Sequence, residues 1–507
     1  MGIFNVLFSD IEWGEDEAKN DEDLDNYFVE FPGYDKIIQG KKRFIVGRKG
    51  TGKSAILQKI RLKSLSDATY LSLYLGKLHA TYFYIDISLR DFPLNDFKAL
   101  GEKGHQDKSK YVSAWKFLLL VEIAGMVLED NSVDASEELD NVRTFINQNF
   151  PNGISVVQTV NTLRENENKV TVMSSWLGGE IKHSRKCEQM AQVHYNKLVT
   201  KLAQLLKNMN IDSRYFLLID ELDEGYKQKN SNLNVVILAL LRAADEIYNE
   251  FKNNMNCIPV TALRSDIFDN LEDNDLNKLD DYVLRLNWTT DENAPWSLKK
   301  IAEKRIEATL RKKYPQLPIA DCWDIVADDS SAPKGLWQYI CALTFSRPRD
   351  IIKLLKYCSQ DMKGNKLTLS EVQSVEDKYS DWFYREFRDE AQSFLSCWKG
   401  ALNCISEIAQ GKDKVEKLEF KLSENSEVKE WCKSNNKTVM DVIKILFNYS
   451  VIGCINEKGR WIFKYKDEYF EFMTSYPDYC VHYGFCRKLR IPKSYDKIVL
   501  DANRQYK

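Results

Sequence analysis

Residues 44–55 decide the fold, and they read Phe44-Ile45-Val46-Gly47-Arg48-Lys49-Gly50-Thr51-Gly52-Lys53-Ser54-Ala55. An apolar run is followed by a glycine-rich loop that ends in Lys-Ser, and residues 55–60 have the composition of a helix. A strand, a glycine loop and a helix in this order form the context in which the motif binds nucleotide phosphates. The alternative is a glycine-rich turn before an ordinary helix. The flanking pattern favours a phosphate-binding loop.

Each residue type in the loop has its own predicted role. The glycines let the backbone curl so that N–H groups face phosphate oxygens, and the helix N-terminus adds the positive end of its dipole. Lys53 would reach the β- and γ-phosphates, and the Ser54 hydroxyl would ligate Mg²⁺. The expected contacts with ATP are Gly47, Arg48, Lys49, Gly50, Thr51, Gly52, Lys53, Ser54 and Ala55.

A second acidic motif follows a different apolar strand. The run Tyr215–Ile219 ends in Asp220-Glu221, and Leu222-Asp223-Glu224 comes next. Ligands bind outside the carboxyl ends of parallel strands, so these acids would lie near the phosphate loop. Asp220 would hold Mg²⁺, and Glu221 would act as the general base on the attacking water. The alternative is a solvated acidic turn after a core strand.

The remaining pattern predicts an α/β core with a parallel sheet, because strands alternate with helices. The other predicted strands are 81–87, 258–263 and 282–286, and the predicted helices are 115–128, 190–206 and 234–247. Residues 130–185 are the least regular part, with a strand-like piece at 169–173, and we treat this segment as an insertion into the core.

Composition limits the broad class of the protein. The 507 residues favour about three domains, and 44% hydrophobic with 29% charged residues is typical of a globular protein. A net charge of −3 leaves no global footprint for nucleic acid, although a local basic face stays open. We see no signal peptide and no apolar run long enough to span a membrane. The 11 cysteines lack CxxC pairs, so we expect thiols, including Cys480 and Cys486, and a cytoplasmic location.

Two arginines are further candidates for contact with the nucleotide. Arg264 follows the strand at 258–263, where polar groups would lie beside the γ-phosphate. Arg349 belongs to Ser346-Arg347-Pro348-Arg349-Asp350, which begins a predicted helix. Arginine binds phosphate well but is also common on surfaces, so a surface role is the alternative for both residues.

The N-terminal stretch 9–30 is strongly acidic and ends near Tyr27-Phe28-Val29. One interpretation is a solvated helix that leads into the core. The other is that Tyr27, Phe28 and Val29 dock near the adenine. The sequence does not separate the two.

Residues 44–55 resemble a group of bacterial P-loop ATPases related to AAA+ and STAND proteins, whose members often lie in phage-defence or mobile loci. The layout implied by this resemblance is close to that of origin-recognition ATPases. Asp220-Glu221 then correspond to the Walker B acids, Arg264 to the sensor-one position and Arg349 to the sensor-two position. Lys53, Asp220, Glu221, Arg264 and Arg349 are accordingly the expected catalytic set, with Ser54 and Asp220 as the metal ligands.

The resemblance also implies a domain order. It gives a P-loop ATPase core at 1–292 with the insertion near 130–185, a helical lid at 293–385, and a winged-helix-like domain at 386–507. In the last domain, residues 439–446 would form a helix, 451–455 the strand that leaves it, and 461–465 a wing strand.

The resulting hypothesis is a slow ATPase with Mg²⁺ as cofactor, acting as a nucleotide-dependent switch between core and lid. No nuclease, protease or deaminase signature is found in the chain, so a role in antiviral defence requires a partner effector or self-association. A membrane partner is not expected. The alternatives are a DNA-binding origin-recognition-like ATPase and a nucleotide-stabilised scaffold.

Overall fold

The computed structural model describes residues 6–63, 82–88, 93, 97, 108–151, 153–155, 159–160, 187–221, 231–271, 276–316, 321–332, 335–455, 461–472 and 475–492. The chain divides into two compact units. The sheet unit consists of Phe31–Arg48 and Lys53–Leu286, and the helical unit of Met1–Glu30, Lys49–Gly52 and Asn287–Lys507. The tip of the phosphate loop therefore groups with the helical unit, and the loop's two flanks group with the sheet unit.

Among its described residues, the sheet unit has five parallel strands, which confirms the predicted α/β core. These are β1 (Phe44–Gly47), β2 (Tyr82–Ser88), β3 (Arg214–Asp220), β4 (Asn256–Arg264) and β5 (Val283–Arg285). Their order is β2-β3-β4-β1-β5, so β4 lies between β1 and β3. Because all neighbours are parallel, the carboxyl ends of the strands meet at one edge of the sheet, where the predicted site residues follow β1, β3 and β4.

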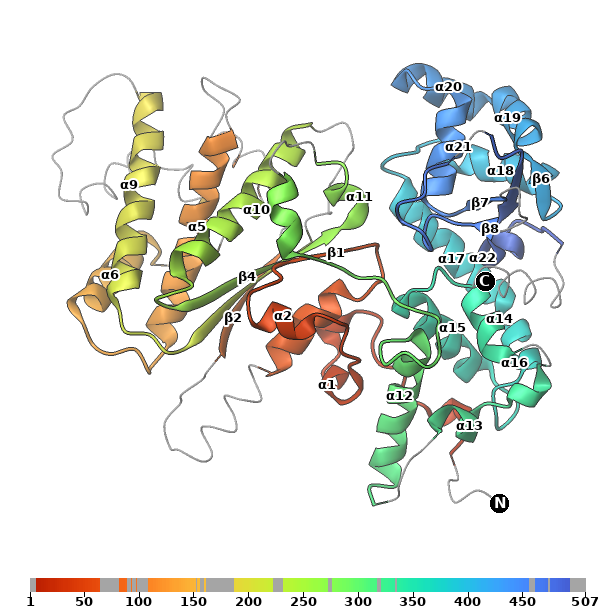
Figure 1. Ribbon diagram of the computed structural model, residues 1–507, viewed down its shortest axis with the longest axis horizontal. Coiled ribbons are helices and arrows are strands. Elements are labelled where there is room, and N and C mark those ends of the chain that lie inside the picture. Colours follow the sequence, from red (N-terminus) through yellow and green to blue (C-terminus); the bar gives the residue numbers. More distant parts are fainter. Residues whose placement is uncertain are drawn as a thin grey trace. The chain divides into compact units, whose positions relative to one another are not determined.

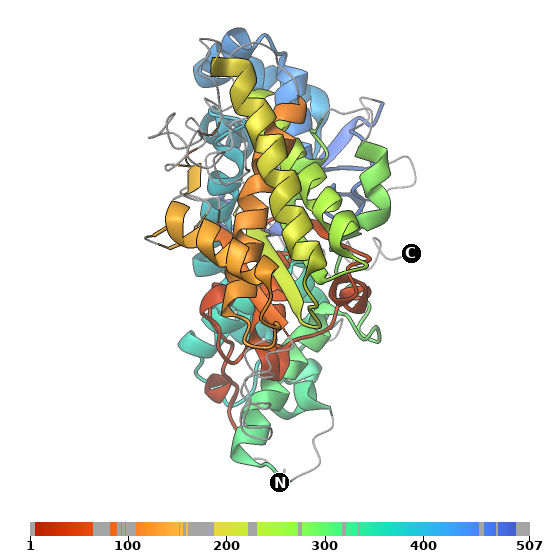
Figure 2. The same ribbon diagram turned by 90° about the vertical axis from the view of Figure 1, so that its left-hand side faces the viewer.

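Long apolar helices cover this sheet. The helices α5 (Lys108–Glu129) and α10 (Ser231–Phe251) pack against it, and α9 (Cys187–Asn208) packs on α5 (Figures 1 and 2).

By length and composition, Tyr111–Glu129 of α5 could cross a membrane, contrary to our expectation that no run is long enough. However, 72% of that stretch is buried inside the protein, as expected of a core helix. Shorter elements are α2 (Tyr34–Ile38), α11 (Ser265–Phe268) and η3 (Leu276–Tyr282).

Part of the segment predicted to be irregular is a regular helix. Glu137–Asn149 forms α6, which packs against α5 and α9. It begins there because the Ser136 side chain accepts a hydrogen bond from the Leu139 N–H, and buried Val142 and Phe145 supply its apolar face. The strand-like piece at 169–173 lies outside the described residues.

The described residues of the first part of the helical unit are mainly helical, as predicted for the lid. Its elements are α12 (Leu298–Lys313), α13 (Cys322–Val326), η4 (Asp329–Ser331), α14 (Leu336–Ala342), α15 (Pro348–Asp361), α16 (Leu369–Ser374) and α17 (Glu376–Ala391). Pro348 suits the first turn of α15, where its missing N–H costs no helical hydrogen bond.

The second part of the helical unit combines helices with a small antiparallel sheet. Its helices are α18 (Trp398–Ile408), α19 (Val415–Glu424), α20 (Ser426–Asn435), α21 (Val439–Asn448) and α22 (Tyr483–Cys486). The strands β6 (Lys412–Lys414), β7 (Ile452–Ile455), β8 (Trp461–Ile462) and β9 (Asp478–Val481) have the order β6-β9-β7-β8. The predicted helix at 439–446 and strand at 451–455 are present as α21 and β7. The winged-helix class itself stays a prediction.

The predicted wing strand is shorter than expected. It pairs only through Trp461 and Ile462, and the predicted continuation to Tyr465 is wrong. The Tyr465 N–H donates to the Ser450 hydroxyl at 2.9 Å, where a paired strand residue would bond to a neighbouring strand. Phe463 and Tyr465 are instead buried in the core of the helical unit.

The acidic N-terminal segment also belongs to the helical unit, whereas we assigned it to the ATPase core. It contains η1 (Phe8–Asp10), η2 (Ala18–Asn20) and α1 (Leu24–Tyr27). Phe8 and Trp13 are buried in this unit's core, and Asp16 bonds to Lys353 at 2.7 Å and to Lys356 at 2.8 Å. Apolar burial and ion pairing together explain the different assignment, and the segment is not a solvated helix.

The packing also bears on the proposed adenine contact. Tyr27 and Val29 are both buried in the helical unit, where the Tyr27 hydroxyl donates to Asp21 and the Arg305 guanidinium lies 4.5 Å from the Tyr27 ring centroid. Two of the three side chains in that hypothesis are thus taken up by internal packing.

Candidate functional site

The backbone of the phosphate loop depends on its glycines. Gly50 and Gly52 have φ of 82° and 94°, which favours glycine because a side chain would crowd the following carbonyl. A Cβ on Gly50 would also lie 3.1 Å from the Cβ of Arg349. Residues 53–63 then form the predicted helix. The sequence pattern of strand, loop and helix is therefore realised here.

Lys53 and Ser54 lie at the start of that helix in the sheet unit. Lys53 Nζ donates to the carbonyls of Gly47 at 2.9 Å and Arg48 at 3.1 Å. Ser54 Oγ donates to Asp220 Oδ2 at 2.7 Å, although β4 separates their two strands. The structure thus brings together the predicted metal ligands from residues more than 160 positions apart. A hydroxyl and a carboxylate in contact match the oxygen ligands that Mg²⁺ prefers.

Glu221 follows Asp220 in an unusual backbone conformation. Its φ is 62°, a left-handed value that is uncommon for a residue other than glycine, and its N–H donates to Asp220 Oδ1 at 2.9 Å. Such conformations cost free energy and cluster at functional sites. Residues 222–224, which include the two further acids Asp223 and Glu224, lie outside the described residues.

Arg264 occupies the predicted position at the sheet edge, but its guanidinium has a local partner. It ends β4 opposite Gly47 in the strand register. Its Nε and NH2 donate to the two carboxylate oxygens of Asp266 at 2.9 and 2.6 Å, and 12% of its side chain is exposed. A contact with phosphate would have to compete with this bidentate pair.

Arg349 lies against the tip of the loop in the helical unit. Its backbone N–H donates to the Gly50 carbonyl at 3.3 Å. Its guanidinium and the ammonium of Lys49 each lie 3.4 Å from one oxygen of Glu386, which belongs to α17. The side chain of Arg349 is 35% exposed, whereas that of Glu386 is 18% exposed. One carboxylate therefore pairs with two cations that were predicted to contact ATP.

Arg347 bonds directly to the loop backbone, although the sequence pattern pointed only to its neighbour Arg349. Its NH1 donates to the Lys49 carbonyl at 2.8 Å and to Glu390 at 2.8 Å, and its Nε bonds to Asp350. Burial disfavours its charge, but the carboxylates of Asp350 and Glu390 outweigh burial and raise its pKa. Arg347 is thus a buried, permanently charged donor that holds the loop backbone.

Trp288 is a functional candidate that sequence reasoning missed. Its indole Nε1 donates to the Thr51 carbonyl at 2.8 Å. It follows β5 in a stretch with no motif, so no signal in the sequence distinguishes it from other tryptophans. Glu386 and Glu390 were likewise missed, because acids on an amphipathic helix resemble any solvated face.

Comparison with known families agrees with this geometry. Residues 17–227 match the ORC-CDC6-like family, a range that includes the phosphate loop, Asp220 and Glu221. Residues 296–388 match the FunZ-associated C-terminal helical domain, which spans α12 to most of α17. No curated protein matches the chain. The matches support a P-loop ATPase of the AAA+ type with a helical C-terminal part.

A solved structure is also similar, the crystal structure of Cdc6p from Pyrobaculum aerophilum. It is 10% identical, and the similarity covers 94% of this chain and 98% of that one, with a TM-score of 0.29.

Proposed function

We propose that the protein binds and slowly hydrolyses ATP, and that its nucleotide state acts as a switch. The observation that carries this proposal is the 2.7 Å hydrogen bond between Ser54 and Asp220 beside a complete phosphate loop. Lys53 would bind the β- and γ-phosphates, while Ser54 and Asp220 would hold Mg²⁺. Bound Mg²⁺ supplies positive charge that neutralises the phosphate oxygens during transfer.

Glu221 is the proposed general base. A base contributes typically about 10²–10⁴-fold to the rate when it orients and deprotonates the attacking group. The left-handed backbone of Glu221 costs free energy, and such strained residues cluster at functional sites. This conformation therefore supports the role of Glu221 as the base. In this proposal Arg264 and Arg349 add contacts with the γ-phosphate, provided that each leaves its carboxylate partner.

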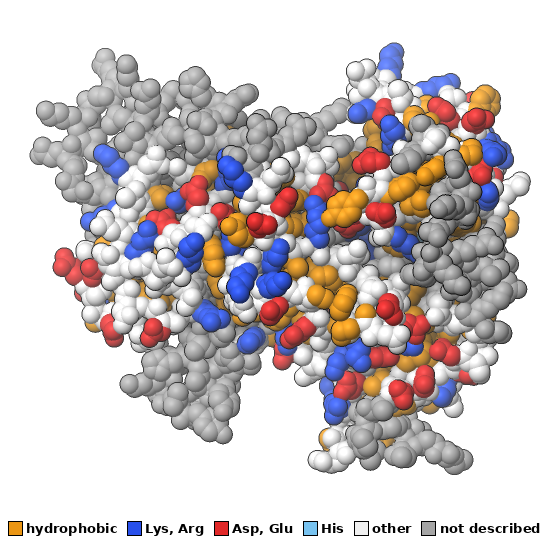
Figure 3. Space-filling view, in the orientation of Figure 1, with side chains coloured by type: hydrophobic (Ala, Val, Ile, Leu, Met, Phe, Trp, Pro, Cys, Tyr) orange, Lys and Arg blue, Asp and Glu red, His pale blue; other side chains and the backbone are white. Residues whose placement is uncertain are grey.

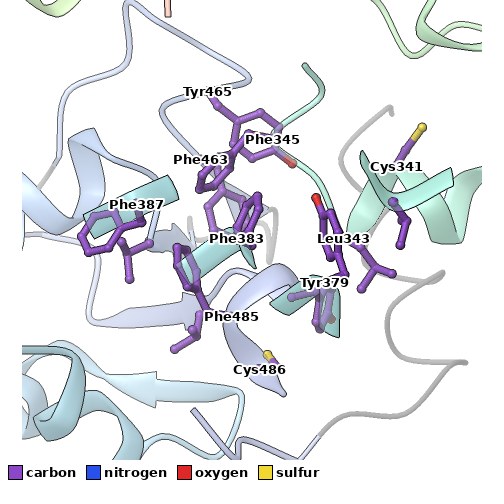
Figure 4. Packing of buried hydrophobic residues seen from close by; sticks show 14 of the residues in the cluster. Cys341, Leu343, Phe345, Tyr379, Phe383, Phe387, Phe463, Tyr465, Phe485 and Cys486 are labelled. Carbon is purple, nitrogen blue, oxygen red and sulfur yellow. The ribbon is translucent and has the colours of Figure 1, made fainter. Parts of the chain in front are cut away.

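The switch proposal rests on α17, because residues of this one helix contact both the loop tip and the C-terminal part of the helical unit. Glu386 and Glu390 contact the tip of the phosphate loop and Arg347, as described above. On the same helix, Phe383 and Phe387 pack against Phe485 of α22, with ring centroids 4.9 and 5.6 Å apart. Figure 4 shows this aromatic cluster joining segments from both parts of the helical unit. Movement of the loop tip would therefore shift α17 and, through these aromatic contacts, the C-terminal part of the helical unit.

We propose that the switch controls a partner effector, or self-association, in antiviral defence in the cytoplasm. The sequence resemblance alone supports the defence role. The ten described cysteines are free thiols, which agrees with a reducing compartment.

The test of the site is Asp220→Asn, which keeps the shape of the side chain but weakens an oxygen ligand for Mg²⁺. We expect Mg²⁺-dependent phosphate release to fall at least tenfold, within the range of lost metal and base contributions. Asp212→Asn is the matched control, because Asp212 is exposed just before β3. Full Mg²⁺-dependent activity in Asp220→Asn would rule out the proposed metal site.

The alternative function is a DNA-binding origin-recognition-like ATPase, which the ORC-CDC6-like match favours. On the face shown in Figure 3, basic and acidic side chains of the helical unit are interspersed. Such mixing disfavours a large phosphate footprint on that face, because several cations must release counterions together. Fluorescence anisotropy with duplex DNA at two salt concentrations tests this alternative, since specific binding would weaken steeply as the salt concentration rises.

A further inference from the structure

Three consecutive carbonyls at the tip of the phosphate loop accept hydrogen bonds from the helical unit. The Lys49 carbonyl is bound by Arg347, the Gly50 carbonyl by the Arg349 N–H, and the Thr51 carbonyl by Trp288. The donor–acceptor distances are 2.8, 3.3 and 2.8 Å. The donors come from two segments of the chain, one after β5 and one at the start of α15. These bonds hold the loop by its backbone and do not depend on the loop's own side chains.

Peptide geometry converts these bonds into an orientation of N–H groups. In a planar trans peptide, the carbonyl of one residue and the N–H of the next point in opposite directions. Fixing the carbonyls of residues 49–51 therefore directs the N–H groups of Gly50, Thr51 and Gly52 away from the donors. These N–H groups belong to the part of the motif whose backbone cradles phosphate oxygens.

The two side-chain donors are themselves held in place. Arg347 is 3% exposed and bonds to Asp350 and Glu390, so its planar fork has little freedom. Trp288 packs against the buried core of the helical unit. A donor fixed by its surroundings loses little conformational entropy when it orients an acceptor.

We propose that Arg347 and Trp288 are positioning residues that preset the phosphate loop for nucleotide. They act through the loop backbone and need not contact ATP. This inference rests on the proposed nucleotide site. Because the cradle serves phosphates that ADP and ATP share, loss of a positioning bond should weaken both nucleotides by the same factor. That pattern differs from the loss of a γ-phosphate contact, which weakens ATP more than ADP.

Trp288→Phe is the sharpest test, because it deletes the indole N–H but keeps an aromatic ring. A neutral hydrogen bond is worth about a fivefold change in an equilibrium constant, so Kd should rise about fivefold for both ADP and a non-hydrolysable ATP analogue. The full-length protein is titrated by calorimetry in the presence of Mg²⁺. Hydrogen–deuterium exchange of the peptide covering residues 47–54, measured without nucleotide, should become faster.

Trp337→Phe is the matched control. Trp337 is buried in the same unit, and its indole N–H has no hydrogen-bond partner among the described residues. It should leave both nucleotide affinities and the exchange of the loop peptide unchanged. Arg347→Lys keeps a cation beside Asp350 and Glu390 but loses the planar fork, so it should act in the same direction as Trp288→Phe.

The outcomes separate this inference from the proposed function. Unchanged exchange at 47–54 in Trp288→Phe would overturn the positioning role, whether or not nucleotide binds. Faster exchange with unchanged Kd values would also overturn it, because the bond would then hold the loop without aiding binding. Wild-type protein that binds neither nucleotide would refute the proposed function itself, while the exchange data would still report on the loop.

Discussion

Replacing Arg349 by alanine tests whether the lid arginine distinguishes ATP from ADP. If Arg349 reaches the γ-phosphate, the variant should bind ATP more weakly and leave ADP almost unaffected. A charge-assisted hydrogen bond is worth about 1.5–3 kcal/mol. This gross value must be reduced, because Arg349 has first to leave Glu386.

The structure sets the size of that reduction. The pair of Arg349 and Glu386 is 3.4 Å long and its arginine is 35% exposed, so it resembles a surface ion pair worth about 0–1 kcal/mol. The net loss for ATP should then be about 1–2 kcal/mol, or about 5- to 30-fold in Kd. Glu386→Gln should act in the opposite direction and strengthen ATP binding about two- to fivefold, since it frees both Arg349 and Lys49 from a competing carboxylate.

Calorimetric titration with ADP and a non-hydrolysable ATP analogue measures both effects. Arg385→Ala is the control, because Arg385 lies on α17 beside Glu386 but is 54% exposed and pairs with Asp381. Equal changes for the two nucleotides, or none, would show that Arg349 is only a loop-packing residue. Opposite signs for Arg349→Ala and Glu386→Gln are the signature of competition for the phosphate.

Three further outcomes are expected. Lys53→Ala should abolish measurable ATP binding by calorimetry, because the β- and γ-phosphates lose the lysine of the motif. Retained micromolar affinity would contradict the proposed site. Glu221→Gln should bind ATP but release phosphate about 10²–10⁴-fold more slowly, and unchanged turnover would transfer the base role to another acid such as Asp223. Trp13→Ala should destabilise the helical unit by about 3–5 kcal/mol in urea unfolding, because Trp13 is buried in its core; an unchanged midpoint would mean that the N-terminal segment is not part of that core.

Local patterns in the sequence determined the α/β core of this protein. Short, mainly apolar runs rich in β-branched and aromatic residues predicted the five parallel strands of the described sheet, because such side chains pack well on a pleated, buried surface. The motif at 47–54 and the acids at 220–221 could also be recognised in the sequence, because each has a short, fixed spacing. The start of α15 was predicted as well, because Pro348 is suited to a first helical turn.

Only the tertiary structure decided what holds the loop and where the N-terminus packs. The bonds from Arg347 and Trp288 to the loop join residues more than 230 positions apart, and any buried arginine or tryptophan would satisfy the same local pattern. The acidic composition of residues 9–30 left a solvated helix and an adenine contact as open interpretations, yet Trp13 is buried in the core of the helical unit and Asp16 bonds to Lys353. Long-range pairing of this kind depends on which surfaces meet in the folded chain, and one local sequence window carries no record of its partner.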